Sequence, residues 1–143
     1  MATVYDLVRE RAETYHVDAN QTVINVVRLM IEKNIGAVPV LRNGELVGIF
    51  SERDLMKRVV GENRDAHKTR VADVMTANPL VVSPDEDLEQ CLALMRQHGF
   101  RHLPICQGRQ LKGLVSLRDI LLQTVVEKDG EVRMMRAYIT QSS

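Results

Sequence analysis

A stretch of this 143-residue chain recurs 65 residues further along without a gap, and this repeat constrains the fold more than any other feature. Residues 22–56 align with 87–121, and the matches gather at Pro, at Gly and in a Ser-x-Arg-Asp group. The identical pairs are Leu29/Leu94, Met30/Met95, Pro39/Pro104, Leu46/Leu111, Gly48/Gly113, Ser51/Ser116, Arg53/Arg118 and Asp54/Asp119. Matches at residues that shape the backbone indicate two copies of one supersecondary unit.

Each copy predicts the order β-α-β-β-α, preceded by a short helical opening segment. Apolar residues at helical spacing predict the central helix, and Asn43-Gly44 between apolar runs predicts a hairpin. Gly36 and Gly99 are expected to end the central helices, and Ser51 and Ser116 to cap the last ones. The expected ranges are 3–10, 15–17, 23–31, 37–41, 46–50 and 51–60 in the first copy, and 70–75, 80–82, 88–95, 103–106, 111–115 and 116–126 in the second.

The fold class predicted from these elements is α/β (α+β), with tandem β-α-β-β-α repeats packed through their sheets in pseudo-two-fold symmetry. One copy is too small to bury both faces of its sheet, so the two are expected to share one core. The expected divisions are residues 3–60 for the first repeat, 61–70 for a polar linker and 71–126 for the second repeat. A tail at 127–143 is expected to form a closing helix or an interface.

Composition argues against several function classes. Lys plus Arg and Asp plus Glu both number 19, so the net charge is zero, whereas nucleic-acid binders usually carry a basic excess. No apolar run approaches the roughly 18 residues of a membrane span, and residues 1–10 do not resemble a secretory signal. A cytoplasmic protein that binds neither nucleic acid nor membrane is therefore expected. Cys91 and Cys106 are expected to be buried apolar residues in a reducing compartment.

Motifs of catalysis and metal binding are weak. His98 and His102 are four residues apart, but Gly99 lies between them and His102 begins a strand, so no metal site is predicted. Gly108 and Gly113 have the glycine spacing of a phosphate-binding loop, but the Lys and Ser/Thr that complete it are missing. No Gly-x-Ser-x-Gly motif occurs. The chain is therefore predicted not to be an enzyme, with no catalytic cofactor.

The repeated Ser-x-x-Asp groups admit two interpretations. Ser51 with Asp54, and Ser116 with Asp119, suit a strand that leads into a capped helix, where the dipole favours an acid. The cap alone does not explain why Arg precedes Asp in both copies. A carboxylate at such a junction can also accept hydrogen bonds from a ribose diol, while Arg can reach a phosphate. Both interpretations stay open on the residues alone.

The repeated block resembles the cystathionine β-synthase (CBS) domain over residues 3–126, and the pair resembles a Bateman module. The likeness rests on two Gly-h-h-Ser-x-x-Asp groups (h apolar) and on three further segments: Ala37-Val38-Pro39-Val40, His102-Leu103-Pro104-Ile105 and Asn78-Pro79-Leu80. The doubled motif is similar to small stand-alone bacterial two-CBS proteins. The resemblance implies regulation by an adenine nucleotide (AMP, ADP, ATP or NADH), bound in clefts that draw on both copies.

The resemblance also assigns expected roles within two clefts. Asp54 and Asp119 would hold ribose, while the neighbouring Ser and Arg side chains would lie near phosphates. Residues 78–80 would face Asp54, and residues 14–15 would face Asp119. The segments before each Pro differ, with small residues in one copy and Arg-His in the other, so the two clefts are expected to differ. The residues expected to bind nucleotide are Thr14, Tyr15, Gly36, Ala37, Val38, Ser51, Arg53, Asp54, Asn78, Pro79, Leu80, Arg101, His102, Ser116, Arg118 and Asp119.

Two functions remain as hypotheses. The first is a non-catalytic regulatory module that binds an adenine nucleotide and signals to a regulated protein that the sequence does not name. Modules of this family usually form a disc of four CBS motifs, so the resemblance implies a homodimer. The alternative is a structural scaffold with vestigial clefts.

Overall fold

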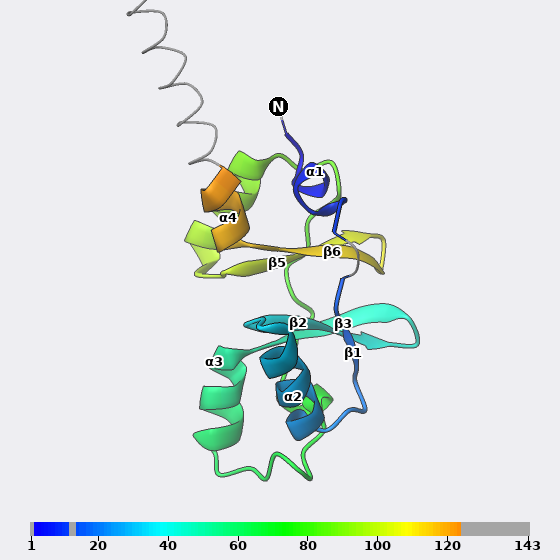
Figure 1. The fold of residues 1–143 in the computed structure, drawn as a ribbon, viewed down its shortest axis with the longest axis vertical. Helices are drawn as coiled ribbons and strands as arrows, with labels where there is room; N and C mark the ends of the chain where they lie inside the picture. The colour runs from blue at the N-terminus through cyan, green and yellow to red at the C-terminus, as the bar shows by residue number, and fades with distance from the viewer. Residues whose placement is uncertain (1, 12–13, 124–143) are drawn as a thin grey trace, which may run out of the picture.

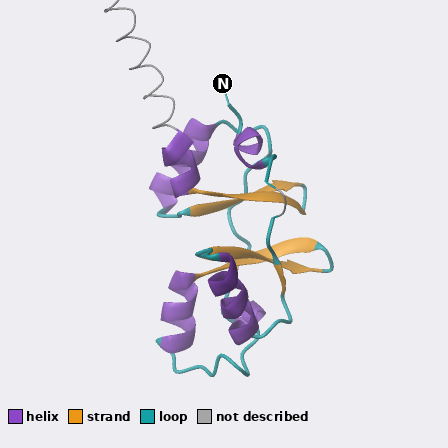
Figure 2. Ribbon diagram, in the orientation of Figure 1, coloured by secondary structure: helices purple, strands orange, loops and turns teal. Residues whose placement is uncertain are grey.

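The computed structural model of the chain describes residues 2–11 and 14–123. Two halves stack along the longest axis, with their sheets facing each other at the centre and their helices on the outside (Figure 1, Figure 2). The strands β3 (Glu45–Ser51) and β6 (Gln110–Ser116) contact each other between the halves. The Leu46 N–H also donates to the Arg109 carbonyl at 3.1 Å. The mixed α and β architecture and the packing through sheets confirm the predicted fold class.

The first half contains a four-stranded sheet in the order β1-β2-β3-β4. Strand β1 runs parallel to β2, and the other neighbours are antiparallel. The helix that follows β3 begins as a short α-helix and continues as a π-helix, in which the Gly61 N–H donates to the Met56 carbonyl five residues back. The elements are α1 (Val4–Val8), β1 (Val17–Asp18), α2 (Val23–Lys33), β2 (Ala37–Arg42), β3, α3 (Glu52–Asp54) and η1 (Leu55–Val60).

The second half repeats this arrangement with a smaller sheet, in which β5 and β6 are antiparallel. Val82 forms a single parallel bridge to Ile105 where the first half has β1. Residues 117–123 are helical, and the expected tail at 127–143 lies outside the described residues. The elements of the second repeat are η2 (Val71–Asp73, a 3₁₀ turn), β4 (Thr76–Ala77), α4 (Leu88–His98), β5 (His102–Gln107) and β6, of which β4 pairs in the sheet of the first half.

The opening segment of each repeat packs on the opposite half. Helix α1 donates backbone hydrogen bonds to residues 84 and 86, and its buried Val4 and Val8 join the second core. In exchange, β4 pairs with β3 at the edge of the first sheet. Each packing unit therefore combines the body of one repeat with the opening segment of the other.

This exchange explains the repeated glycines. A Cβ atom at Gly48 would lie 2.3 Å from Met75 Sδ and 2.9 Å from the Thr76 carbonyl oxygen. A Cβ atom at Gly113 would lie 2.9 Å from a methyl group of Val8. In both halves the opening segment of the opposite repeat approaches the strand so closely that a Cβ atom would force its neighbours to shift.

The expectation of one shared core is wrong, because the structure forms two. Val23, Val38 and Phe50 are fully buried in the first, and Leu103, Val115 and Ile120 are buried in the second. Each helical layer covers the outer face of its own sheet, so the sheets meet through partly buried side chains. Burial by the opposite repeat's opening segment completes each core.

The sequence predicts the end of α4 correctly but misplaces the end of α2. Helix α2 ends at Asn34, which is left-handed (φ 53°), and not at Gly36. Helix α4 ends at Gly99 (φ 71°), as expected. Since Asn and Gly both tolerate this conformation, either can end a helix. No helix within the described part of the chain is long and apolar enough to cross a membrane.

Candidate functional site

A cavity of about 660 Å³ opens beside Asp54, where the two halves meet. The first half contributes the end of β3 and the helix after it, and the second contributes β4, the following loop and the turn before β5. The cavity is lined by Gly36, Ala37, Ile49, Ser51, Glu52, Arg53, Asp54, Lys57, Arg58, Thr76, Pro79, Leu80, Gly99, Phe100, Arg101 and His102. A volume of this size suits a nucleotide-sized molecule, since small-molecule pockets span roughly 300–1,000 Å³.

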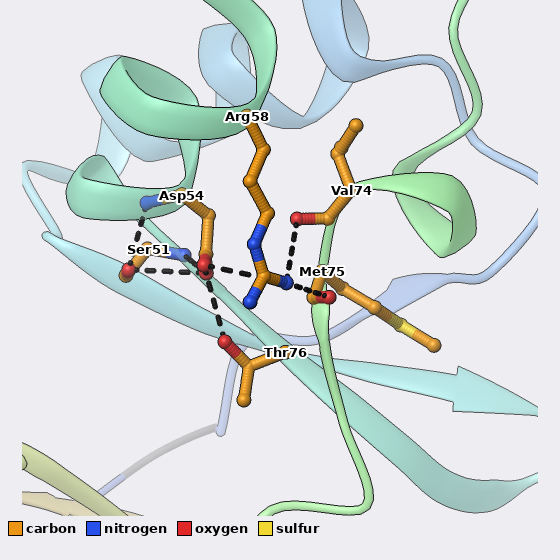
Figure 3. A network of polar contacts seen from close by, with 6 residues as sticks. All are labelled: Ser51, Asp54, Arg58, Val74, Met75 and Thr76. Carbon is orange, nitrogen blue, oxygen red and sulfur yellow. Dashed lines mark hydrogen bonds and ion pairs between the residues drawn. The ribbon is translucent and has the colours of Figure 1, made fainter. Parts of the chain in front are cut away.

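Asp54 lies at the bottom of this site and is held by a capping box (Figure 3). Its Oδ2 accepts hydrogen bonds from the Ser51 N–H at 2.9 Å and the Ser51 hydroxyl at 3.1 Å. Its Oδ1 accepts one from the Thr76 hydroxyl at 3.1 Å. These bonds use three of the roughly four lone-pair positions of a carboxylate, so Oδ1 retains capacity for a ligand hydroxyl.

Arg58 joins the same network from the π-helical turn (Figure 3). Its Nη1 lies 3.9 Å from Asp54 Oδ1 and donates to the carbonyl oxygens of Met75 and Val74. The guanidinium therefore links the helix after β3 to the opening segment of the second repeat. A π-helical turn directly after Asp54 is a form that often marks functional sites.

The charges around the cavity favour an anion. Four cationic side chains line it, against two carboxylates. The cations are Arg53, Lys57, Arg58 and Arg101, and the carboxylates are Glu52 and Asp54.

His102 is the first residue of β5 and lines the cavity from the second half. Burial lowers the pKa of His102, although the carboxylates of Asp119 and Glu52 act to raise it and Arg101 acts to lower it. Because the pKa is lowered, the neutral imidazole is favoured near pH 7, and it can both donate and accept a hydrogen bond. Nearby, the rings of Phe100 and His98 stack at 5.4 Å.

The equivalent aspartate of the second repeat has a different environment. Asp119 Oδ2 accepts from the Ser116 N–H at 2.9 Å, as in the first repeat, but it also contacts Arg11 Nη2 at 2.8 Å. Burial acts to raise the pKa of Asp119, but hydrogen bonds from Arg11 and Ser116 outweigh it and hold the pKa below its ordinary value. The carboxylate is therefore already paired with a cation of its own chain.

The structure brings nine of the sequence-predicted residues into one cavity: Gly36, Ala37, Ser51, Arg53, Asp54, Pro79, Leu80, Arg101 and His102. The small residues before Pro39 and the Arg-His pair before Pro104 were expected to distinguish two clefts, but they line the same one. They meet there because β2 and β5 begin on facing sheets.

Seven predicted residues lie outside that lining. Val38 is fully buried in the first core. Tyr15 packs against that core, with Lys33 Nζ 5.3 Å from its ring centroid, and Thr14 is half-buried. The Asn78 N–H donates to the Val47 carbonyl, and Arg118 is exposed. Ser116 and Asp119 form the second capping box.

Sequence reasoning missed several cavity residues. Arg58 follows Asp54 by four residues, a spacing that brings side chains together on a helix, and this signal was available. Thr76 had no local signal, because it reaches Asp54 only through the exchange of opening segments. The missed residues are Ile49, Glu52, Lys57, Arg58, Thr76, Gly99 and Phe100.

The structure also bears on metal binding and on thiol chemistry. Across residues 2–11 and 14–123, no group of three His, Cys, Asp or Glu side chains is placed to hold a metal ion. Cys91 and Cys106 are buried and free, as expected. Burial, followed by the carboxylates of Glu86 and Asp87, raises the pKa of Cys91 to about 11, and burial raises that of Cys106. Neither thiol is therefore activated as a nucleophile.

Sequence comparison finds the same family twice in the chain. The profile of the CBS domain matches residues 3–61 and 71–124. The CBS domain-containing protein YhcV of Bacillus subtilis is 36% identical over 120 residues, which cover 84% of each chain. The mitochondrial CBS domain-containing protein CBSX3 of Arabidopsis thaliana is 33% identical over 125 residues, which cover 84% of this chain but only 61% of that protein.

Solved structures share the fold. A protein with CBS domains from Burkholderia ambifaria superposes with a TM-score of 0.82 at 35% identity, covering 87% of this chain and 95% of that one. CBSX2 in complex with AMP superposes with a TM-score of 0.76 at 26% identity, covering 90% of this chain and 99% of that one.

Proposed function

The chain belongs to the CBS domain family and carries two CBS motifs, and we propose that the pair is a non-catalytic regulatory module that binds an adenine nucleotide beside Asp54. One observation carries this proposal. A cavity of about 660 Å³ combines a buried carboxylate with four cationic side chains drawn from both repeats. A ribose needs a hydrogen-bond acceptor for its hydroxyls and a phosphate needs cations, and this cavity offers both.

The carboxylate end of the cavity suits a ribose. Asp54 Oδ1 retains acceptor capacity, and the Thr76 hydroxyl beside it can turn to donate to or accept from a sugar hydroxyl. Since the Ser51 bonds fix Asp54 Oδ2, the carboxylate is positioned before any ligand arrives. Such preorganisation reduces the ordering cost of binding.

The remainder of the cavity suits a phosphate and a base. Arg53 and Lys57 leave the helix after β3 near Asp54, while Arg101 approaches from the opposite half. Guanidinium groups bind phosphate oxygens through paired N–H donors. Pro79 and Leu80 supply an apolar wall for adenine. CBSX2, a neighbour at 26% identity, is solved with AMP, which makes AMP the first nucleotide to test.

A ligand in this cavity would contact both halves at once, and this is the basis for a regulatory role. It stabilises whichever arrangement of the halves brings its contacts together, and a partner that prefers that arrangement is bound more tightly in consequence. We also propose a homodimer. Met56 and its repeat counterpart Leu121 are exposed apolar residues on the helices after Asp54 and Asp119, with Val60 and Leu122 exposed nearby.

Calorimetric titration with AMP, and with adenosine in parallel, tests the proposal. We expect saturable AMP binding by the wild type and at least about tenfold weaker binding of adenosine, because adenosine lacks the phosphate that four cations serve. The variant Asp54→Asn removes the ribose acceptor charge and is expected to weaken AMP binding by at least about tenfold. ADP, ATP, NADH and S-adenosylmethionine extend the series.

The matched control is Asp87→Asn, which also alters a helix-capping aspartate. Asp87 accepts a hydrogen bond from the Gln90 N–H at the start of α4 and does not line the cavity. It should lose a little stability and keep its AMP affinity. If protein free of carried-over nucleotide binds no member of the series, the nucleotide proposal fails and a structural scaffold becomes the better interpretation.

A further inference from the structure

The opening segment of the opposite repeat delivers a different group to each aspartate. Thr76, from the second repeat, donates its hydroxyl to Asp54 at 3.1 Å. Arg11, from the first repeat, places its Nη2 atom 2.8 Å from Asp119 Oδ2. The opposite repeat therefore gives Asp54 a small neutral group, with Arg58 of its own helix 3.9 Å away, and gives Asp119 a full cation in direct contact.

Arg11 also takes the place of a backbone strand. In the first half, β4 pairs with β3, with Thr76 opposite Ile49. In the second half, the repeat counterpart of Ile49 is Leu114, and its carbonyl accepts a hydrogen bond from Arg11 Nη1 at 3.0 Å. The guanidinium is thus held at two points, one on the carboxylate and one on the strand that leads to it.

The length of the opening segment allows this arrangement. Nine positions separate Val8 from Val17, but only seven separate Met75 from Val82, so the first repeat carries two extra residues where it crosses to the other half. The shorter segment continues as a paired strand, whereas the longer one brings a long side chain to the carboxylate.

We propose that Arg11 closes the Asp119 cleft to nucleotide, so that each chain binds one nucleotide, beside Asp54. This inference rests on the proposed function and specifies which of the two clefts is used. The Arg11 guanidinium, held on Asp119 Oδ2 and on the Leu114 carbonyl, occupies the space beside the carboxylate that a ribose would need, and moving it breaks an ion pair between two full charges. At Asp54 the nearest guanidinium, Arg58, is 3.9 Å away and donates to the Val74 and Met75 carbonyls, so a sugar hydroxyl needs only to join or reorient a threonine hydroxyl. Arg11 is thus a residue that determines specificity, and its removal should open a second site.

Calorimetric titration with AMP distinguishes the possibilities through the number of sites. We expect one AMP per wild-type chain and two per Arg11→Ala chain, with affinity at the second site rising at least about tenfold over the wild type. Adding Asp119→Asn to Arg11→Ala should return the count to one. The matched control is Arg9→Ala, which removes an arginine of the same segment that pairs with Asp6 at 3.8 Å on the surface. Arg9→Ala should keep one site, and thermal unfolding should show all variants folded.

Each other outcome is decisive. One AMP bound by both the wild type and Arg11→Ala would overturn the role of Arg11 and leave the proposed function standing. Two AMP bound by the wild type, one of them lost in Arg11→Ala, would make Arg11 a ligand-binding residue instead. If the wild type binds no AMP but Arg11→Ala binds one, closure by Arg11 holds and the Asp54 site fails. If neither binds AMP, both proposals fail.

Discussion

Asp54 and Asp119 occupy equivalent positions in the two repeats and form the same capping box, yet their surroundings differ. The side chain of Asp54 is only 9% exposed, accepts hydrogen bonds from two hydroxyl groups and lies 3.9 Å from the Arg58 guanidinium. The side chain of Asp119 is 26% exposed and is paired with a guanidinium at 2.8 Å. The repeated motif thus reproduces its local hydrogen bonds in both halves, whereas the group that reaches the aspartate from the other repeat differs, and we expect that group to decide what each aspartate binds.

The repeated glycines should show the largest difference between the halves. Gly48→Ala would force its Cβ against Met75 and against the Thr76 backbone oxygen at 2.9 Å. Gly113→Ala would meet a single valine methyl group at 2.9 Å. Since backbone yields less readily than a side chain, we expect Gly48→Ala to cost about 2–3 kcal/mol of unfolding free energy and Gly113→Ala about 1 kcal/mol.

Urea denaturation of both variants measures this difference, with Gly36→Ala as the control. A Cβ at Gly36 would lie 3.5 Å from the nearest atom, which is ordinary contact, so a change within about 0.5 kcal/mol is expected. Equal losses of unfolding free energy in Gly48→Ala and Gly113→Ala would show that both opening segments accommodate a Cβ atom equally well, and would contradict the expected difference between the halves.

The pairing of Arg11 with Asp119 should contribute a smaller stability effect, confined to the second half. The Arg11 side chain is 41% exposed, so Arg11→Ala should cost only about 0.5 kcal/mol near pH 7. The pKa of Asp119 is lowered in the folded state, so the contribution is present above the ordinary carboxyl pKa of 3.8 and is lost as the pH falls through the folded value.

Urea denaturation at a series of pH values from 7 to about 3 would show this dependence as a difference in unfolding free energy between wild type and Arg11→Ala that decreases once the pH falls below 3.8. Arg9→Ala serves again as the comparison, because its ion pair with Asp6 is longer and more exposed to solvent than that of Arg11 with Asp119. A difference that persists unchanged near pH 3 would mean that Asp119 is not the partner that matters.

His102, whose counterpart in the first repeat is Ala37, should make the second half the more acid-sensitive one. Burial lowers the pKa of His102 from 6.5, with Asp119 and Glu52 opposing the shift and Arg101 adding to it. As the pH falls below 6.5, the imidazole of His102 therefore binds a proton more readily in the unfolded chain than in the folded one, and the free energy of unfolding decreases. We expect a small effect, because nearby carboxylates partly offset the burial.

Comparing wild type with His102→Gln at pH 7.5 and pH 5.5 isolates this residue, since the other histidines are common to both proteins. The wild type should lose more unfolding free energy between these pH values than the variant. An identical loss in the two proteins would show that His102 titrates alike in the folded and unfolded states.

Local patterns explain which parts of this account could be predicted from the sequence. Apolar spacing, Asn43-Gly44 and the Ser-x-x-Asp groups act over a few residues, so the helices, strands and helix caps could be predicted from the sequence. The π-helical form of Leu55–Val60 was not, because apolar spacing over six residues does not distinguish it from an α-helix. The end of α2 at Asn34 was not predicted, because glycine is the commoner residue at a left-handed helix end and Gly36 lies only two residues further on.

Long-range placement explains the rest. The packing of Val4 and Val8 on the second core, and the contacts of Thr76 and Arg11 with aspartates of the opposite repeat, depend on where the opening segments cross. Nothing in their own sequence encodes that crossing. The same crossing places Gly36 and Arg101 around one cavity, which a copy-by-copy interpretation assigned to separate clefts.

A crystal structure of the wild type grown with AMP would show which aspartate holds the ribose. We expect one AMP in the cavity beside Asp54, with a ribose hydroxyl on Asp54 Oδ1, the phosphate among the cavity's cationic side chains, and Arg11 still paired with Asp119. AMP bound at Asp119 with Arg11 displaced and the Asp54 cavity empty would contradict this expectation.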